Sequence, residues 1–265
     1  MGQTLVPDGL WKIVEPLLPA QRERPQGGGT RYVNDRAVFT AIVYVLTTGC
    51  AWRHLPADFA VSKATAHRRC VVWTEAGLWR RLHRAVLVRL GEQAAIDWSR
   101  AVVDAASVRA KKGGPLTGPT PVDRGKPGAK LHVLTDAAGL PLAVATSAAN
   151  THDSLALIPL VQAIPAVRSR RGPRRRRPAK LHADKGYDYP HLRAWLRRRR
   201  ITPRIARRGV ETSTQLGRHR WVVERSFAWL TGYRWLTLRY ERSARLFTAF
   251  LTLAAALTCY KKLAT

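Results

Sequence analysis

Short apolar segments at helical spacing dominate the first third of the chain. Between residues 34 and 95, three segments carry apolar residues every three or four positions, and capping residues or glycines bound them. The capping and ending residues are Asn34 or Asp35, Ser62, Gly49 and Gly77. A shorter helical piece covers residues 10–19 and ends at a proline. The pattern therefore predicts an all-helical region over residues 1–98.

After residue 98 the pattern becomes mixed, with β-branched alternating segments between helical ones. We expect strands ending near Asp104 and near Asp184, two strands around a turn at residues 136–139, a short strand at 201–208, and helices at 151–164, 189–200, 216–236 and 243–262. Thr151 or Asp153 can cap the first of these helices. The predicted fold class is α/β: a mixed sheet flanked by helices and preceded by the helical region.

The longest apolar stretch, residues 246–258, is too short and too rich in Ala and Thr to cross a bilayer. We expect a buried helix there and no membrane partner. The three cysteines, Cys50, Cys70 and Cys259, are scattered, which argues against a disulfide framework or a zinc site. The first residues lack a cationic segment followed by an apolar one, so we expect no signal peptide and a cytoplasmic protein.

Charge changes this picture from a generic α/β protein to a binder of polyanions. Lys and Arg total 46 against 17 Asp and Glu, a formal net charge of +29. Such a field attracts DNA or RNA, and the planar guanidinium of Arg suits phosphate. The arginine-rich run at residues 168–178 is expected to be a loop with nonspecific, salt-dependent DNA affinity. The alternative is a merely soluble basic protein.

Three of the rare acids stand where stability does not require them. Asp104 and Asp184 follow the apolar segments AVV and KLHA, and Glu224 lies inside the apolar and aromatic helix WVVERSFAWL. Carboxylates from two strands and a helix can hold two divalent cations, and oxygen ligands with open water positions suit Mg²⁺. Two such ions catalyse in-line phosphoryl displacement. The sequence thus predicts catalytic and metal-binding roles for these three acids.

Each acid also has a structural interpretation. Asp104 alone is more often a hydrogen-bonding residue at the end of a strand. Asp188 suits a turn or helix cap, and Asp123 and Asp136 lie in predicted loops, so these three are weaker candidates. His182 shares a strand face with Asp184, where a core histidine is the simpler interpretation. The combination of the three acids, rather than any one of them, indicates a site.

These stretches carry a resemblance to a known family. TGCAWRHLP, VVDAASVRAKKGG, TGPTPVDRGKPGAKLHVLTDAAGLPLA, ADKGYD, RHRWVVERSFAWL and RYERSA occur in this order over residues 10–262. The chain resembles transposases of the IS5 group within the IS4-type DDE superfamily of bacterial insertion sequences. The resemblance implies a helical DNA-end-recognition region at residues 1–98 and an RNase H-like catalytic domain at 99–265. It also implies a DDE triad, which falls on Asp104, Asp184 and Glu224.

The resemblance also implies DNA contacts on the Glu224 helix. The superfamily signature places an Arg four residues before the Glu, and Arg220 matches it as a DNA-phosphate or DNA-end contact. The signature's Tyr and Lys are absent, because Gly217 and Thr231 occupy their positions. Arg225, Tyr233 and Arg234 are the nearby candidates to replace them.

Two further sets of residues are candidates for DNA contact. Lys63, His67, Arg68 and Arg69 share one predicted helix, which either enters a DNA groove as a helix-turn-helix does or forms the solvated basic face of a bundle. The aromatic residues Trp221, Phe227, Trp229 and Trp235 are able to stack on unpaired bases. Their helical spacing makes core packing the expected role for most of them.

The first functional hypothesis is therefore a DNA transposase. It would use two Mg²⁺ ions, with Mn²⁺ as a substitute, and bind the terminal inverted repeats of its element as a homo-oligomer. It would cleave DNA and transfer strands to target DNA in the bacterial cytoplasm, at the nucleoid. The second hypothesis is a non-catalytic DNA-binding protein, such as a decayed transposase. A plain RNase H-like nuclease or resolvase is a weaker third.

Overall fold

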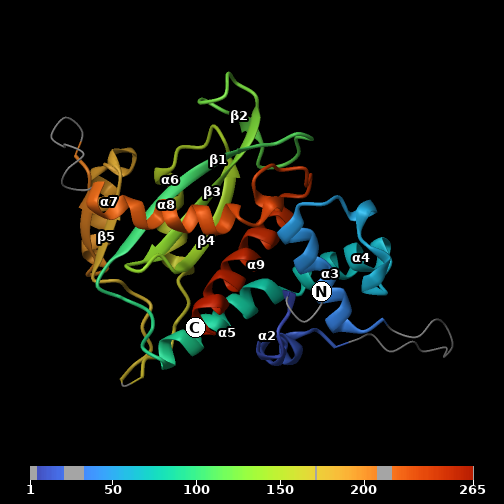
Figure 1. The fold of residues 1–265 in the computed structure, drawn as a ribbon. Helices are drawn as coiled ribbons and strands as arrows, with labels where there is room; N and C mark the ends of the chain where they lie inside the picture. Colours follow the sequence, from blue (N-terminus) through green and yellow to red (C-terminus); the bar gives the residue numbers. More distant parts are fainter. Residues whose placement is uncertain (1–4, 21–32, 171, 208–216, 265) are drawn as a thin grey trace.

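The computed structural model describes residues 5–20, 33–170, 172–207 and 217–264. Its first part is helical (Figure 1). The helices are α2 (Asp8–Val14), followed by the 3-10 turn Glu15–Leu17, α3 (Asp35–Thr48), α4 (Lys63–Glu75) and α5 (Leu78–Glu92), with 3-10 turns at Trp52–His54 and Ala57–Phe59 between α3 and α4. The all-helical prediction is confirmed for the described part of this region.

The predicted caps of these helices form as expected. The Asn34 side chain accepts hydrogen bonds from the backbone N–H groups of Arg36 and Ala37, and Ser62 accepts one from Thr65. Gly49 ends α3 in the left-handed conformation, where its missing Cβ avoids strain. Local sequence therefore sets the boundaries of α3 and the start of α4.

The second part folds around a sheet. Its strands are β1 (Ala101–Arg109), β2 (Gly118–Pro119), β3 (Pro127–Asp136), β4 (Pro141–Ala148), β5 (Lys180–Ala183) and β6 (Thr202–Ile205). β3 pairs antiparallel with β1 and β4, whereas β5 is parallel to β1 and β6 is parallel to β5. The spatial order β4-β3-β1-β5-β6, with three antiparallel strands followed by two parallel ones, is the RNase H-like arrangement. The predicted fold class is confirmed.

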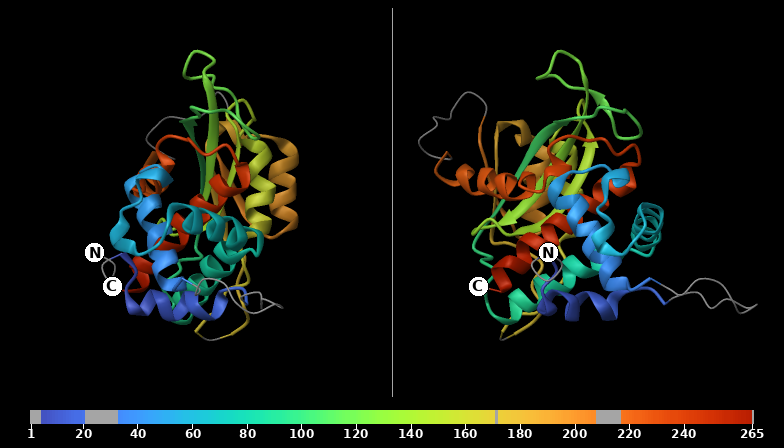
Figure 2. Two further views of the ribbon diagram at one scale, coloured as in Figure 1. Left: turned by 90° about the vertical axis from the view of Figure 1, so that its right-hand side faces the viewer. Right: turned by 45° about the vertical axis from the view of Figure 1, so that its right-hand side comes forward.

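Helices cover both faces of this sheet. α6 (Ser154–Ala163) and α7 (Pro190–Arg198) lie on one face, and α8 (Gly217–Thr231) and α9 (Ala244–Leu263) lie on the other (Figure 2). The 3-10 turns Lys185–Tyr187 and Arg234–Leu236 complete this part. α9 also packs along α5, so buried residues of the helical part and of the sheet belong to one continuous core.

α9 is the buried apolar helix that the sequence predicts. Among the described residues, it is the helix long and apolar enough, by length and composition alone, to cross a membrane. However, 72% of its most apolar window is buried inside the protein. Its role in this fold is that of a central core helix between α5 and the sheet.

One boundary prediction is wrong. β1 does not end near Asp104 but continues to Arg109, because β3 pairs with it over all nine residues. On its other side, β1 pairs with β5 at Ala101 and Val102 alone, since β5 ends at Ala183. Asp104 therefore lies in the middle of a strand, just beyond the point where its parallel neighbour stops.

Candidate active site

The parallel pair of β1 and β5 brings Asp104 and Asp184 to the same edge of the sheet. Val102 is in register with His182, and each aspartate follows its partner residue by two positions. Side chains two positions apart share a strand face, so both aspartates lie on one face of the sheet. Both are half-buried. Two carboxylates on neighbouring strands, in reach of solvent, are available to a cation or a substrate.

Local hydrogen bonds orient both carboxylates. The backbone N–H of Ala105 donates to Asp104 Oδ1 at 2.8 Å, and that of Gly186 donates to Asp184 Oδ1 at 2.9 Å. Asp184 also caps the 3-10 turn that follows β5. A Cβ at Gly186 would lie 3.0 Å from Asp184 Oδ1, so a larger residue there would press on this carboxylate. The short KGY turn thus holds the Asp184 carboxylate in place.

Tyr187 is a residue of this site that the sequence interpretation missed. Its side chain is 1% exposed, and its hydroxyl has no hydrogen-bond partner among the described residues. Burial raises the pKa of Tyr187, and the nearby carboxylates of Asp153, Asp104 and Asp184 raise it further. A neutral phenol therefore lies near three acids. The sequence signal for this residue was its position three residues after Asp184.

Asp153 extends the acidic group from the start of α6. Its carboxylate pairs with Lys130 Nζ at 2.8 Å, and Lys130 also donates to the backbone oxygen of Thr151 at 2.8 Å. Asp153 occupies the N-cap position but makes no side-chain capping bond. Lys130 thus neutralises the third acid near Tyr187 and leaves Asp104 and Asp184 as the better candidates for a cation.

Glu224 lies on α8, the helix that covers the face toward which Asp104 points. Asp104 pairs with Val133 and shares its face with Thr146, whose hydroxyl lies 2.6 Å from that of Thr248 on α9. The buried positions of α8 are Val222, Val223, Ser226 and Leu230. Glu224 is exposed on the opposite side of the helix. The structure therefore brings the two aspartates together but does not direct Glu224 toward them.

A complete metal cage is not formed by the described side chains. No three His, Cys, Asp or Glu residues in the described ranges are close enough together to hold a metal ion. The oxygen donors of Asp104 and Asp184 nevertheless fit a hard divalent cation, which binds carboxylates and keeps several waters. The assignment of Asp104, Asp184 and Glu224 as metal ligands therefore stays a prediction.

An arginine between two tryptophans occupies the exposed side of α8. The Arg225 guanidinium lies 4.6 Å from the Trp221 ring centroid and 4.8 Å from that of Trp229. It also donates to the backbone oxygen of Ala138 at 2.6 Å, which ties α8 to the β3–β4 turn. Trp221 is 53% and Trp229 39% exposed, so the expectation of core packing is wrong for these two.

The other candidates on α8 and after it have different surroundings. Trp235 is buried and Phe227 is half-buried against the core, as expected. Tyr233 is also buried, whereas Arg234 is exposed. The side chain of Arg220 lies outside the described residues. Of the candidates to replace the missing Tyr and Lys of the signature, Arg234 is accessible and Tyr233 is not.

The basic residues of α4 divide into two kinds. Lys63, His67 and Arg68 are exposed. Arg69 instead forms an ion pair with Asp35 at 2.9 Å and lies over the Trp73 ring. Arg69 therefore joins α4 to the start of α3, whereas Lys63 and Arg68 face solvent.

The weaker acidic candidates have structural partners. Asp136 is buried and accepts backbone hydrogen bonds from Asp97, Ala138 and Leu140. Asp188 pairs with Arg193 at 2.8 Å, and Asp123 pairs with Lys126 at 3.5 Å. These contacts agree with the sequence analysis, in which the three aspartates are weaker candidates for a functional site.

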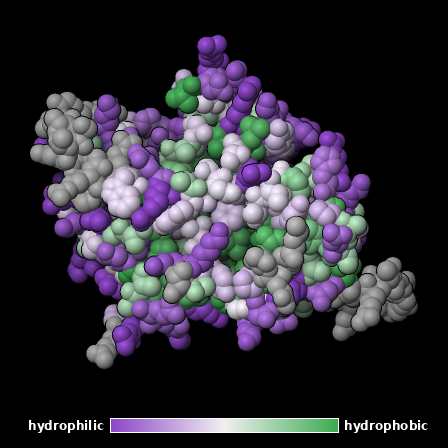
Figure 3. All heavy atoms as spheres, in the orientation of Figure 1, coloured by the Kyte–Doolittle hydropathy of each residue, from purple (hydrophilic) through white to green (hydrophobic). Residues whose placement is uncertain are grey.

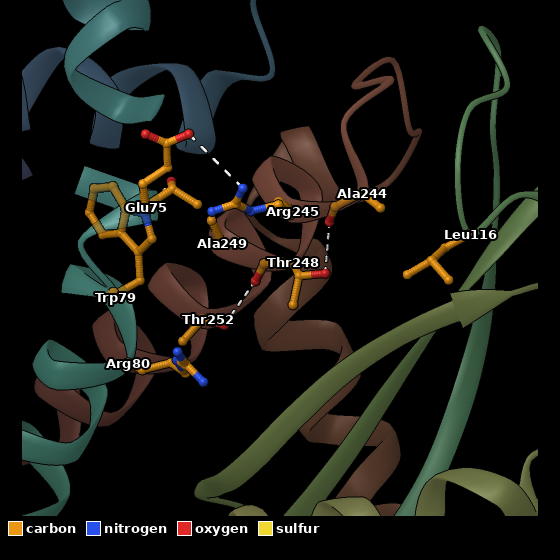
Figure 4. A pocket seen from close by; sticks show the side chains of 11 residues that line it. Glu75, Trp79, Arg80, Leu116, Ala244, Arg245, Thr248, Ala249 and Thr252 are labelled. Carbon is orange, nitrogen blue, oxygen red and sulfur yellow. Dashed lines mark hydrogen bonds and ion pairs between the residues drawn. The ribbon is translucent and has the colours of Figure 1, made fainter. Parts of the chain in front are cut away.

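Two hollows lie away from the acids. One, of about 350 Å³, is lined by residues of α4, α5 and α9, with the Glu75–Arg245 ion pair at its rim (Figure 4). The other, of about 490 Å³, runs along β4 and shares Arg80 and Leu116 with the first. Neither of these two hollows is lined by Asp104, Asp184 or Glu224.

The fold and the paired aspartates define an RNase H-like protein with an acidic site where the pairing of β1 with β5 stops. A family model described as "Transposase DDE domain" matches residues 98–259, more than half of the chain. Another, described as "Putative transposase of IS4/5 family", matches residues 6–83. The chain therefore belongs to the DDE-domain transposases of the IS4/5 family. Such enzymes cleave DNA and transfer its strands, and they generally use divalent metal ions.

Curated relatives agree with this family. The chain is 48% identical over 151 residues to "Putative transposase for insertion sequence element IS402" of Burkholderia cepacia, covering 57% of this chain and 72% of the relative. It is 42% identical over 123 residues to "Insertion element IS402 uncharacterized 16.2 kDa protein" of the same organism, covering 46% and 84%. The prediction of an insertion-sequence transposase is confirmed.

Solved structures of other transposases are more distant. The piggyBac transposase synaptic complex with hairpin DNA has a TM-score of 0.45 and 9% identity, covering 99% of this chain and 74% of that one. The Mos1 transposase paired-end complex with left transposon end has a TM-score of 0.31 and 11% identity, covering 91% and 82%. At these scores the likeness carries no argument, and the fold assignment rests on the strand order.

Proposed function

We propose that this transposase binds the terminal inverted repeats of an insertion sequence of the IS5 group and carries out DNA cleavage and strand transfer at Asp104, Asp184 and Glu224. The observation that carries the proposal is the register of β1 and β5, which sets two half-buried aspartates side by side within a matched DDE domain. The quoted sequence stretches support the IS5 group.

The three acids would hold two Mg²⁺ ions, or Mn²⁺ in their place. When bound, these ions activate a water or a 3′-hydroxyl and stabilise the leaving oxygen. The protein's own contribution is to orient the carboxylates: backbone N–H groups donate to both aspartates, and the buried, uncharged Tyr187 side chain lies near them. Glu224 joins them after a rotation or shift of α8, because its side chain now faces solvent.

The rest of the chain would bind DNA. We assign end recognition to residues 1–98, through Lys63 and Arg68 on α4, and catalysis to residues 99–265. Arg220 and Arg225 would contact DNA beside Glu224, and Arg69 would act by holding α4 on α3. The net charge of +29 supports a nucleic-acid partner. A homo-oligomer would pair two element ends in the bacterial cytoplasm.

One observation favours the second candidate, a DNA-binding protein without catalysis. Glu224 lies on the side of α8 away from the sheet, and the described residues form no three-ligand metal site. A binder would use the same arginines and would not need the acids.

Cleavage of supercoiled plasmid carrying the element's flanking ends distinguishes the transposase from the non-catalytic DNA-binding protein. The wild-type protein, Asp184→Asn and the control Glu92→Gln are compared in Mg²⁺ or Mn²⁺ at matched DNA occupancy. Glu92 is an exposed acid on α5 that pairs only loosely with Arg168, at 3.3 Å. The transposase proposal expects cleavage by the wild type and Glu92→Gln but not by Asp184→Asn. Binding without cleavage by all three would support the binder.

A further inference from the structure

A rigid arm projects from the sheet between β1 and β3. It comprises residues 111–126, including the two-residue strand β2, and its later half, residues 118–126, projects from the sheet (Figures 1 and 2). Its earlier half is held by the buried Arg239, which donates to the backbone oxygens of Leu116 and Pro115 at 2.8 and 2.7 Å. Its base is fixed by close packing: a Cβ on Gly118 would lie 2.0 Å from Asn150 Oδ1, and one on Gly128 would lie 2.1 Å from Thr120 Oγ1. The arm therefore leaves the sheet in a defined direction.

The tip of the arm is a closed turn. The backbone N–H of Thr120 donates to Lys126 O at 2.9 Å, that of Gly125 donates to Thr120 O at 3.1 Å, and Lys126 N–H donates to Asp123 O at 2.9 Å. Lys126 and Asp123 also form an ion pair. Arg124 and Gly125 adopt the left-handed conformation that this tight reversal requires. Local bonds, rather than a core, hold the tip in shape.

This fixed turn exposes an apolar residue. Val122 is 82% exposed, more than any other large hydrophobic side chain among the described residues, and Pro121 beside it is also exposed. The arm carries four basic residues against the single acid Asp123: Arg124 and Lys126 lie in the same turn as Val122, and Lys111 and Lys112 follow β1 at the base of the arm. Figure 3 shows a largely hydrophilic surface at this end of the molecule with a small hydrophobic area.

An exposed apolar side chain with basic side chains on the same segment is suited to contact a DNA groove. Proteins that contact the minor groove place apolar side chains against base steps while Arg and Lys neutralise the flanking phosphates. A second copy of this chain, at +29, would be repelled by the same cations. The arm also rises from the strand that carries Asp104: five residues of β1 separate Asp104 from Arg109, about 17 Å at 3.3–3.4 Å per residue. One duplex turn spans about 34 Å, so a duplex bound at the acids is long enough to reach the arm.

We propose that the arm is a DNA-contacting element in which Pro121 and Val122 enter a groove of the DNA bound at Asp104 and Asp184, while Lys111, Lys112 and Arg124 contact its phosphates. This proposal rests on the proposed function, because it takes DNA as the substrate of that site. It assigns a role to residues 111–126, which belong neither to the acidic site nor to the helical region.

The test measures binding of the full chain to a fluorescent duplex of arbitrary sequence, about four helical turns long at 10–10.5 base pairs per turn, over a salt series. Val122→Ser is expected to weaken binding about tenfold at every salt concentration, because it removes apolar contact without charge. Arg124→Gln is expected to lower the salt slope by about one phosphate contact. Circular dichroism should show both variants folded, since neither side chain is buried.

Matched controls are Leu155→Ser, which removes another exposed apolar side chain, 67% exposed on α6, and Arg89→Gln, which removes an exposed charge on α5. If Val122→Ser binds DNA as tightly as Leu155→Ser, the arm proposal is overturned while the wild type's plasmid cleavage still supports the proposed function. Val122-dependent binding to anionic vesicles but not to the duplex, or Val122-dependent self-association in sedimentation, would also overturn it. A wild type that binds no DNA overturns both proposals.

Discussion

Two ends of the sheet carry aspartates that look alike in the sequence but differ in their surroundings. At the β3–β4 turn, Asp136 is buried and both of its oxygens accept backbone hydrogen bonds. At the ends of the β1–β5 pairing, Asp104 and Asp184 are half-buried, and each is oriented by a single described backbone N–H through Oδ1.

The difference separates an acid that builds the fold from acids that are available for chemistry. Burial and three backbone donors make Asp136 part of the turn, with hydrogen bonds to both carboxylate oxygens. At the β1–β5 end the pairing of the two strands stops after Val102 and His182, and both aspartates that follow remain in reach of solvent. An acid after an apolar strand is thus a better candidate for a ligand where it stays in reach of solvent than where it is buried as part of a turn.

The largest expected effect comes from removing an available acid. Asp104→Asn should lower plasmid cleavage by more than about 100-fold, because loss of even an outer-shell partner of a metal ligand costs 10–100-fold. Its unfolding midpoint in urea should stay near that of the wild type, since this carboxylate is in reach of solvent and Asn keeps its size and a hydrogen-bond-accepting oxygen. Cleavage at near wild-type rates would show that Asp104 is a structural residue and remove the contrast with Asp136.

At Asp136 we expect the opposite result, a loss of stability. Asp136→Ala removes the acceptor of three backbone N–H groups and should lower the free energy of unfolding by about 2–4 kcal/mol. Urea denaturation measures this, with Asp184→Ala as the matched control, which should change stability far less. Equal destabilisation by the two variants would contradict the distinction between the two ends of the sheet.

The pH dependence of stability sharpens the same comparison. Burial raises the pKa of Asp136 to about 6, against an ordinary value of 3.8, despite its hydrogen bonds. The folded state therefore holds this proton more tightly than the unfolded state, and this contribution to stability is lost as pH rises through about 6. Between pH 5 and 7 the loss should be about 1 kcal/mol.

Urea unfolding of the wild type and of Asp136→Asn at pH 5 and pH 7 isolates this contribution, because the variant cannot titrate there. The stability of the wild type relative to the variant should fall toward pH 7. A difference that stays constant, or grows with pH, would mean that Asp136 is not held protonated by burial.

Much of this fold follows from local sequence. The caps at Asn34 and Ser62, the stop at Gly49 and the turn at residues 136–139 were predictable, because each depends on residues next to it. The end of β1 was not, since the strand continues past Asp104 through its pairing with β3, whose residues follow 19 to 27 positions later in the chain. The length of β1 depends on its pairing with β3, which the spacing of apolar residues within β1 does not reveal.

The site was predictable in the same uneven way. Asp104 and Asp184 could be selected as acids after apolar strands, and their shared face follows from the parallel register. The direction of Glu224 could not, because α8 buries Val222 and Val223 and so turns Glu224 outward. The exposure of Trp221 and Trp229 also depends on how α8 sits on the sheet. Tyr187 was missed because its burial depends on α6 packing over the KGY turn.

The smallest effect expected is at Tyr187, which lies on the open side of the comparison yet is itself buried. Its hydroxyl has no hydrogen-bond partner among the described residues, so Tyr187→Phe should leave the free energy of unfolding unchanged or raise it by up to about 1 kcal/mol. Cleavage should fall by only a few-fold, with a larger change in the Mg²⁺ concentration needed for half-maximal rate, because the phenol stands beside both aspartates. A purely structural tyrosine would leave that Mg²⁺ dependence unaltered. Tyr187→Leu, which removes the ring as well, should instead destabilise the protein, and this separates packing of the ring from the action of its hydroxyl on the acids.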